Sequence, residues 1–328
     1  MSATAYKKEY YEAVMQFLWR QWVNMGIAGH TPAGSGAVYT ADPEALILFT
    51  SAFCRYEQRL YDLMASWMQE YSRVLNPARM KSMQEKAAYK DEASMAYLAH
   101  LCSQTGDTRW QRAATYHPQE SPQAMFYSVD TGKASFCPKQ DEAARRYGLI
   151  RTPFEPQRKH RELSATSSAT LLLTLRGLLG VTARAEVTLL LMTGACTNKD
   201  ISERSGFARN AVAAVLEELE LVNLISRIKH KGALTVYTLA NKGLLSGFTE
   251  DKQVVFPRWA TIFQALGKIW QLLTLPNIEK VTDTCFTGEL NRLFQKEVWP
   301  LLLNCGIKEL EMLNENEAAN FPRVIASI

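Results

Sequence analysis

The sequence has little that would place it in a membrane or build a metal site. No apolar stretch of about 18 residues runs free of charge, so we expect no membrane-spanning helix. The first residues lack the apolar segment of a secretory signal, which favours a cytoplasmic protein. The six cysteines include no CxxC pair, and the five histidines form neither an HExxH motif nor a cluster with cysteine. We therefore expect neither a disulfide framework nor a bound metal.

Motifs for phosphate binding and catalysis are missing as well. The glycine-rich stretch at 26–40 contains neither GxxxxGKS nor GxxxxGKT, and no GxGxxG follows an expected strand. Asp42 and Glu44 are explained as residues that start a helix. His100 and Cys102 lie two residues apart on one expected helix, so they point to different sides. We predict no enzymatic activity and no cofactor.

The composition is that of a soluble globular protein. Hydrophobic residues make up 47% of the chain and charged residues 21%. A length of 328 residues suits two or three units. The 37 basic and 33 acidic residues give a net charge of +4, which is too small to indicate a partner without its distribution along the chain.

Residues 1–115 are expected to form a helical domain. Apolar residues recur at three- and four-residue spacing over 5–25, which predicts a helix with a broad buried face. Asp42-Pro43 and Asn76-Pro77 each combine a capping side chain with a proline at the first helical position, so we expect helices to begin there.

Residues 116–163 are expected to form a proline-containing basic linker. Its five prolines exclude long helices, and one short helix is predicted around 139–148. Two interpretations of its basic half stay open, namely contact with nucleic-acid phosphates or a solvated strap between domains. The span 145–161 carries one acidic residue, Glu155, against six basic ones: Arg145, Arg146, Arg151, Arg158, Lys159 and Arg161.

The third expected unit, 164–250, begins with segments of helical periodicity and ends with segments in which apolar and polar residues alternate, as in strands. An apolar helix is predicted at 164–180, followed by helices at 182–195, 197–206 and 208–223, with Gly206 in the turn before the last. Thr197 offers an N-cap oxygen, and the side chain of Asp200 can bond back to the backbone N–H of Thr197 as in a capping box. Two alternating runs, 224–229 and 234–240, predict a β-hairpin whose turn is the basic sequence HKGA.

The last expected unit, 251–328, is a helical C-terminal region. Aromatic and aliphatic residues at helical spacing predict a helix over 256–275. A further helix within 286–307 should be interrupted by Pro300. The final stretch, NFPRVIASI, is expected to be a short strand or a loose tail.

The order of elements in 182–243 resembles the winged helix-turn-helix of the MarR and ArsR types of bacterial transcription regulator. The resemblance covers about 60 of the 328 residues: a helix, a short helix, a glycine turn, a third helix and a hairpin with a basic tip. It implies a mainly α fold in which a central winged module is flanked by helical regions. In such modules the third helix enters the major groove, and the wing follows the adjacent phosphates or the minor groove.

Carried onto this sequence, the resemblance implies a set of DNA contacts. Arg209 and Asn210 can read guanine and adenine, and Ala213 can offer only a methyl contact to thymine. The implied phosphate contacts are Lys199, Arg204, Arg227, Lys229, His230 and Lys231.

The sequence also departs from the pattern of these regulators. Ala213 and Ala214 stand where polar residues are common, and Glu217, Glu218 and Glu220 make the end of the third helix acidic. We therefore predict a cytoplasmic transcription regulator that binds double-stranded DNA with limited base readout, most simply as a homodimer. The alternative is a non-catalytic, antitoxin-like subunit whose winged module docks protein. In either case the flanking helical regions serve dimerisation, partner binding or sensing.

Overall fold

The computed structural model describes residues 1–29, 39–157, 159–229, 234–248 and 253–328, and the fold is mainly helical, as predicted. The N-terminal helices are α1 (Ala3–Asn24), α2 (Pro43–Phe53), α3 (Gln58–Tyr71), α4 (Pro77–Lys86) and α5 (Glu92–Ser103). The short α6 (Glu142–Arg146) follows, and then α7 (Leu171–Leu179), α8 (Ala183–Thr193), α9 (Asn198–Ser205) and α10 (Arg209–Leu221). The C-terminal helices are α11 (Trp259–Leu273), α12 (Asp283–Leu293), α13 (Trp299–Leu302), α14 (Lys308–Glu311) and α15 (Phe321–Ser327).

The helix starts follow the capping side chains. The Asp42 carboxylate accepts a hydrogen bond from the backbone N–H of Ala45 at 3.1 Å, and Asn76 caps α4 in the same way through the N–H of Arg79. The Thr197 hydroxyl accepts from the N–H of Asp200 at 3.1 Å and begins α9. All three predicted starts are confirmed, because a side-chain acceptor satisfies N–H groups that have no partner within the helix.

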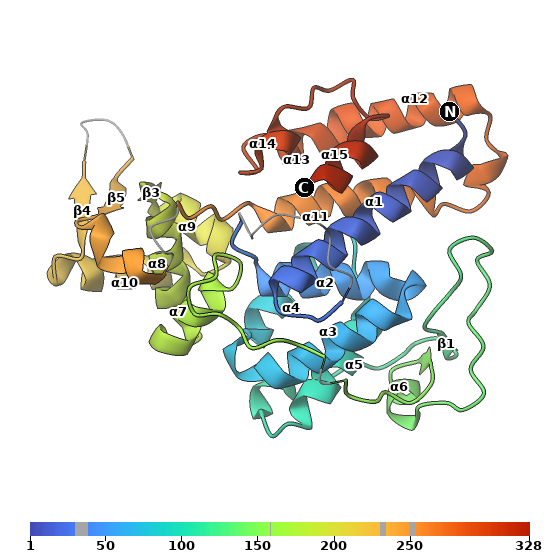
Figure 1. Cartoon of the computed structure of the whole chain (residues 1–328), viewed down its shortest axis with the longest axis horizontal. Coiled ribbons are helices and arrows are strands. Elements are labelled where there is room, and N and C mark those ends of the chain that lie inside the picture. The colour runs from blue at the N-terminus through green and yellow to red at the C-terminus, as the bar shows by residue number, and fades with distance from the viewer. Residues whose placement is uncertain (30–38, 158, 230–233, 249–252) are drawn as a thin grey trace.

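The helices form layers around α1 (Figure 1). Helices α11 to α15 lie on one side of α1 and helices α2 to α5 on the other, while α7 to α10 and a β-hairpin form a smaller lobe at one end. Among the described residues, no helix is long and apolar enough to cross a membrane.

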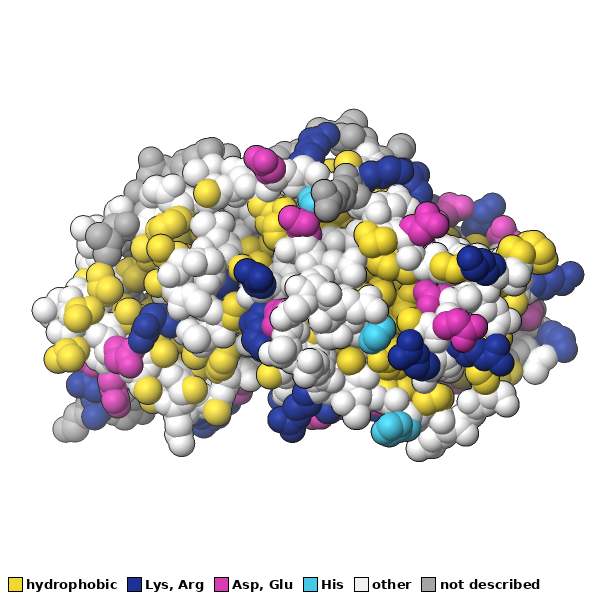
Figure 2. Space-filling model, turned by 90° about the horizontal axis from the view of Figure 1, so that it is seen from below, with side chains coloured by type: hydrophobic (Ala, Val, Ile, Leu, Met, Phe, Trp, Pro, Cys, Tyr) yellow, Lys and Arg dark blue, Asp and Glu magenta, His cyan; other side chains and the backbone are white. Residues whose placement is uncertain are grey.

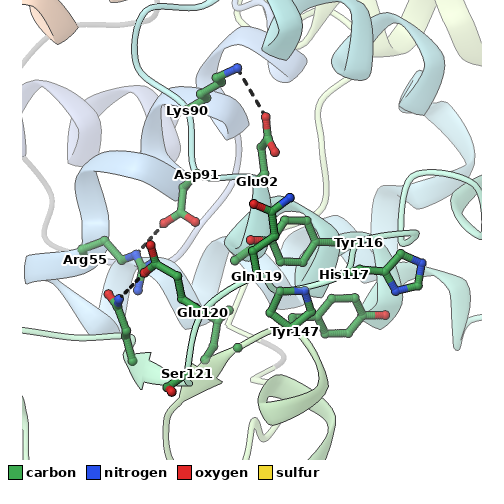
Figure 3. A pocket seen from close by; sticks show the side chains of 15 residues that line it. Arg55, Lys90, Asp91, Glu92, Tyr116, His117, Gln119, Glu120, Ser121 and Tyr147 are labelled. Atoms are coloured by element: carbon green, nitrogen blue, oxygen red, sulfur yellow. Dashed lines mark hydrogen bonds and ion pairs between the residues drawn. The ribbon is translucent and has the colours of Figure 1, made fainter.

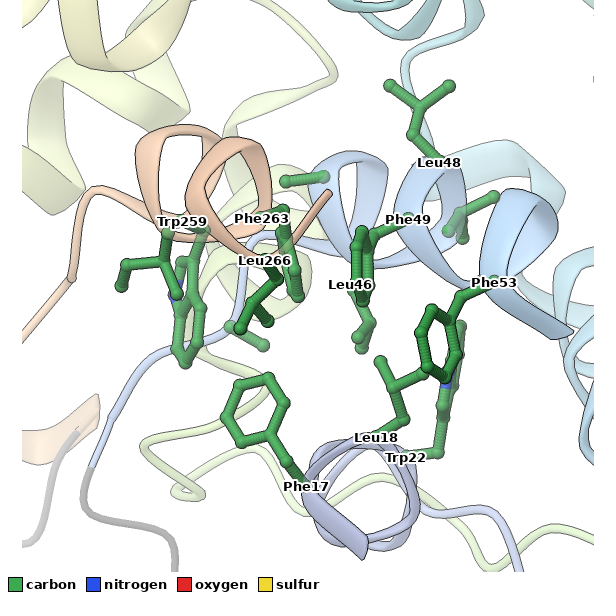
Figure 4. Close-up of a cluster of buried hydrophobic side chains, with 14 of the residues drawn as sticks. Phe17, Leu18, Trp22, Leu46, Leu48, Phe49, Phe53, Trp259, Phe263 and Leu266 are labelled. Atoms are coloured by element: carbon green, nitrogen blue, oxygen red, sulfur yellow. The ribbon is translucent and has the colours of Figure 1, made fainter. Parts of the chain in front are cut away.

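Aromatic side chains from distant parts of the sequence form the centre of the larger body (Figure 4). Phe49 of α2 stacks on Phe263 of α11, with ring centroids 4.9 Å apart, and Trp22 of α1 meets Trp67 edge to face at 5.4 Å. These rings are almost completely buried. Burial of large apolar surfaces from α1, α2 and α11 therefore holds segments together that are more than 200 residues apart.

The end of the chain differs from the sequence prediction. Residues 321–327 form helix α15, which packs against α1, whereas a strand or a loose tail was expected. Phe321 and Ile325 are buried. Pro322 stands in the first turn of α15, where a missing N–H costs no hydrogen bond. The helix was expected to be interrupted by Pro300; the π-helical turn Phe294–Val298 lies between α12 and α13 just before it, and Pro300 itself stands in the first turn of α13.

The proline-containing segment between α5 and α7 is mostly irregular and includes α6 where a short helix was predicted. Strand β1 (Gln123–Ala124) pairs in parallel with β2 (Leu149–Ile150). Arg151 fits neither of the two interpretations of the basic half, phosphate contact or a solvated strap, because it is buried. It is 2% exposed, forms an ion pair with Asp62 at 2.7 Å, and its guanidinium lies 5.4 Å from the ring centre of Phe126. Arg158 lies outside the described residues.

The smaller lobe has the helices and hairpin that were expected between 182 and 240. Strands β4 (Ile225–Ile228) and β5 (Val236–Leu239) pair antiparallel, with Ile225 opposite Leu239. A third strand that the sequence did not indicate, β3 (Cys196–Thr197), pairs with the other edge of β5. Gly206 takes a left-handed conformation at φ 77°, which ends α9 and lets the chain turn into α10.

A buried network of charged side chains joins this lobe to the N-terminal helices. Arg79 of α4 donates to Asp42 at 2.6 Å and to Glu44 at 2.7 Å, and its Nε donates to the carbonyl of Ser205 at the end of α9. Arg176 of α7 donates to Glu44 at 2.6 Å and to Glu186 of α8 at 2.6 Å. The five side chains are each 6% exposed or less, so the lobe is fixed to the body through paired charges rather than through apolar contact alone.

The pKa values of the two glutamates of this network are shifted in opposite directions. Burial alone would raise the pKa of Glu44, but Arg176 and Arg79 outweigh it and hold the pKa at about 2. Burial raises the pKa of Glu186 above its ordinary value despite Arg176, and one of its oxygens, Oε2, has no hydrogen-bond partner. Glu44 is thus stabilised as a carboxylate, whereas the ionised form of Glu186 is disfavoured.

Candidate nucleic-acid interface

Helix α10 presents two distinct faces. Val212, Val215 and Leu216 are buried against the lobe, and Ile201 of α9 lies in the same core. The first turn of α10 is exposed and carries Arg209 and Asn210. The Asn198 side chain donates to the backbone carbonyl of Arg209 at 3.2 Å, which ties the start of α9 to the start of α10 without using the Arg209 side chain. This turn can therefore meet a partner without disturbing the core.

The predicted base contacts differ in exposure. Arg209 and Asn210 are exposed, whereas Ala213, one turn later, is half-buried. The guanidinium of Arg209 can donate two parallel hydrogen bonds, and the amide of Asn210 can both donate and accept. Ala213 has only a methyl group to offer. The capacity for base readout therefore rests on the first turn of α10.

The predicted phosphate contacts are not equally free. Lys199 is exposed and lies 3.8 Å from Glu203, one turn along α9. Arg227 of β4 pairs with Glu220 at 3.1 Å with its side chain 52% exposed. Lys229 is exposed at the end of the described part of the hairpin, whereas His230 and Lys231 lie outside the described residues. Exposed ion pairs of this kind are weak, so Lys199 and Arg227 can exchange their carboxylates for other anions.

Arg204 is the predicted phosphate contact whose placement argues against that role. Its side chain is only 13% exposed and donates to the backbone carbonyl of Phe256, and the guanidinium lies 5.8 Å from the centre of the Phe256 ring. Burial lowers its pKa, although Asp200 opposes this. Arg204 therefore fastens α9 to the segment that leads into α11, and we leave it out of the proposed interface. The resemblance had implied a phosphate contact for Arg204 because of its position on the second helix of the module.

The acidic end of α10 is partly neutralised by arginines. Glu218 pairs with Arg184 at the start of α8, and Glu220 pairs with Arg227. Glu217 is exposed. On the face drawn in Figure 2, basic and acidic side chains of the described residues are interspersed and form no continuous basic surface. On that face a nucleic acid would meet isolated cations rather than a strongly positive groove.

A pocket of about 520 Å³ lies beside the start of α5 and the segment that follows this helix (Figure 3). Four of its charged side chains are paired with one another, Arg55 with Asp91 at 2.5 Å and Lys90 with Glu92 at 3.3 Å, and Glu120 accepts a hydrogen bond from the Gln123 amide at 2.8 Å. His117 and Ser121 lie on different sides of the pocket and point away from each other. Nothing in this arrangement joins a nucleophile to a base.

Sequence reasoning explained Asp42 and Glu44 by their place at the start of α2 and missed their pairing with two arginines. Both residues do occupy the helix start, and their carboxylates also accept from Arg79. Arg79 and Arg176 lie 35 and 132 positions from Glu44, so no local pattern indicates the contacts. Comparison of the chain with protein-family models, with curated proteins and with solved structures found no match.

Proposed function

We propose that residues 164–250 form a winged helix-turn-helix through which the protein binds duplex DNA as a transcription regulator. The observation that carries the proposal is the exposed first turn of α10, where Arg209 and Asn210 project from a helix whose opposite face is buried. The element order α8, β3, α9, α10, β4 and β5, with β5 between the other two strands, supports it. In this arrangement α10 would enter the major groove, and the hairpin would follow the backbone.

The proposed contacts divide by role. Arg209 and Asn210 would read base edges, and Ala213 would add at most a methyl contact. Lys199, Arg227 and Lys229 would contact phosphates, where binding depends on released counterions rather than on sequence. With so few base contacts, one copy would discriminate weakly. Two copies on two half-sites would double the readout, so we propose a homodimer as the binding form.

The test is a titration of the full chain with duplexes from the region upstream of its own gene and with a scrambled duplex, starting at about 50 mM salt. Arg209→Ala should weaken binding to the preferred duplex by about 1–3 kcal/mol and bring the two duplexes closer in affinity. Lys229→Ala should weaken both alike and reduce the slope of log affinity against log salt by about 1. Arg292→Ala is the matched control, since Arg292 is an exposed arginine on α12 paired with Glu289.

The proposal fails if the wild-type protein binds neither duplex at low salt. It also fails if Arg209→Ala and Arg292→Ala have equal effects, because the first turn of α10 would then carry no special contact. Sedimentation of the protein with each duplex measures the stoichiometry. One copy per site at saturation would remove the homodimer from the proposal.

A second candidate function, protein docking through the same lobe, is favoured by a different observation. Leu221 at the end of α10 is 82% exposed and the adjacent Val222 is 60% exposed. Neighbouring apolar side chains of this size are more typical of a contact surface than of a solvated helix end. If duplex binding is absent, Leu221→Ser combined with Val222→Ser should abolish any self-association seen by sedimentation, and an unchanged mass distribution would exclude this surface.

A further inference from the structure

A small apolar cavity lies in the proposed DNA-binding lobe. It has a volume of about 120 Å³, is lined by α7, α8, the end of α10, the hairpin and residues 245 and 248, and is partly open to the surface. Leu191 of α8 and Ile225 of β4 are 2% and 3% exposed and form part of its wall. Leu219 of α10 and Leu239 of β5 line it as well. The cavity is therefore bounded by every main element of the lobe except α9 and β3.

The walls of this cavity offer almost nothing to water. Thr188 and Arg184 are the lining residues with polar side chains, and Arg184 directs its guanidinium to Glu218 at the surface. A closed apolar cavity of about 150 Å³ lined by leucine, isoleucine and phenylalanine binds benzene in another protein. The cavity here is close to that size and has the same kind of lining, and it is in addition partly open to the surface.

We propose that this cavity is a binding site for a small uncharged apolar molecule, of the size of a single aromatic ring or a short hydrocarbon. The volume is too small for a helix or a larger ring system. A carboxylate would lose its hydration against this apolar lining, which disfavours a charged ligand. Access is available because Leu178 and Leu224, two lining residues, are 65% and 36% exposed.

Occupancy of the cavity would act on the elements that carry the proposed function. Leu219 lies on the third helix of the module, and Ile225 and Leu239 lie on the two strands of the hairpin. A molecule that contacts all three holds their relative positions, and it binds more tightly to the arrangement that fits it. This consequence for DNA rests on the proposed function, whereas the binding of the apolar molecule does not.

Benzene is the probe, and the full-length protein is the sample. Thermal unfolding is followed at increasing benzene concentration, and methyl NMR spectra of leucine-labelled protein locate the site. Thr188→Met fills the cavity from α8, and Leu179→Phe fills it from α7, so a failure of one variant to fold leaves the other. Val281→Met, at an exposed position outside the lobe, is the matched control. Benzoate is the matched charged probe.

We expect benzene to raise the unfolding midpoint of the wild-type protein and of Val281→Met in a concentration-dependent way, since a ligand that binds only the folded state stabilises it. The shift should be lost in both filled variants, and benzoate should have no effect. The methyl signals of Leu191 and Leu219 should move with benzene. Three results would overturn the proposal: no shift in the wild-type protein, an equal shift in the filled variants, or a larger shift with benzoate.

Two further measurements separate this proposal from its alternatives. If a second copy of the chain covers the cavity, Leu178→Ser will lower the sedimenting mass and benzene will bind only to the dissociated form, which contradicts a small-molecule site in the assembled protein. Duplex titrations with and without benzene test the link to DNA. If the protein binds no duplex in any condition but still binds benzene, the proposed function is wrong and the cavity proposal holds. If it binds duplex but not benzene, only the cavity proposal is wrong.

Discussion

The buried charges around Glu44 and the exposed charges of α9, α10 and the hairpin are built from the same residue types and behave differently. In the first region five side chains pair at distances of 2.6–2.7 Å and are 6% exposed or less. In the second region the pairs Lys199–Glu203 and Arg227–Glu220 are 3.8 and 3.1 Å long, and each has a side chain more than half exposed. Surroundings, rather than residue type, decide whether a charge holds the fold together or stays available to a partner.

The largest effect is expected from Arg176→Met. The substitution leaves Glu44 with one arginine and Glu186 with none, and breaking a buried pair from one side costs about 3–5 kcal/mol of unfolding free energy. Urea denaturation measures this cost. Arg292→Met, which breaks an exposed pair on α12, serves as the control and should cost less than about 1 kcal/mol. Equal costs for the two variants would mean that the buried network is no more important than a surface pair.

The two glutamates of the network should show opposite dependences on pH. The folded-state pKa of Glu44, about 2, is below its ordinary value of 4.5, so its contribution to stability is present above 4.5 and is lost as the pH falls towards 2. The pKa of Glu186 is raised above 4.5, so its contribution is present below 4.5 and is lost as the pH rises through the raised value.

Urea denaturation of Glu44→Gln and Glu186→Gln at a series of pH values tests this difference. The deficit of Glu44→Gln relative to the wild-type protein should shrink between pH 4.5 and about 2, because protonation removes the charge from the wild-type side chain as well. The unfolding free energy of Glu186→Gln should rise relative to that of the wild-type protein as the pH rises above 4.5, because glutamine carries no disfavoured charge. Parallel curves for both variants would contradict the pKa directions.

The smallest effect is expected at the surface pair between Arg184 and Glu218. Both side chains are about half exposed, so Arg184→Ala should lower the unfolding free energy by about 0.2–1 kcal/mol, and the difference should disappear at high salt. Urea denaturation at low salt and in about 1 M salt checks both points. A cost that persists unchanged in salt would show that Arg184 stabilises α8 by packing rather than by charge.

Local signals in the sequence were sufficient for most helices and for the hairpin. Asp42, Asn76 and Thr197 identify the starts of α2, α4 and α9, because a capping side chain acts within three residues of its own position. The final helix could not be predicted in the same way. Its seven residues are too few for a stable isolated helix, and α15 depends on packing against α1, which lies almost 300 residues earlier.

The charged residues show the limit of sequence reasoning most clearly. Arg151, Arg176 and Arg204 look like any other arginine in the sequence, yet each is mostly buried and bonded to a distant partner. Counting charges over a window cannot reveal this, because burial is set by the tertiary fold. The candidates Lys199, Arg209, Asn210, Arg227 and Lys229 are exposed, as the proposed contacts require.

The packing of α1 has a consequence for the order of events during synthesis. The hydroxyl groups of Tyr6 and Tyr10 on α1 donate to the carbonyls of Ala318 and Leu266, so part of the aromatic face of α1 finds its partners only near the end of the chain. At about 5–20 residues per second, a ribosome needs about 15–60 s to add the intervening residues. During that time part of the aromatic face of α1 lacks its final partners. The nascent chain therefore depends on other contacts to cover this face until the last helix emerges.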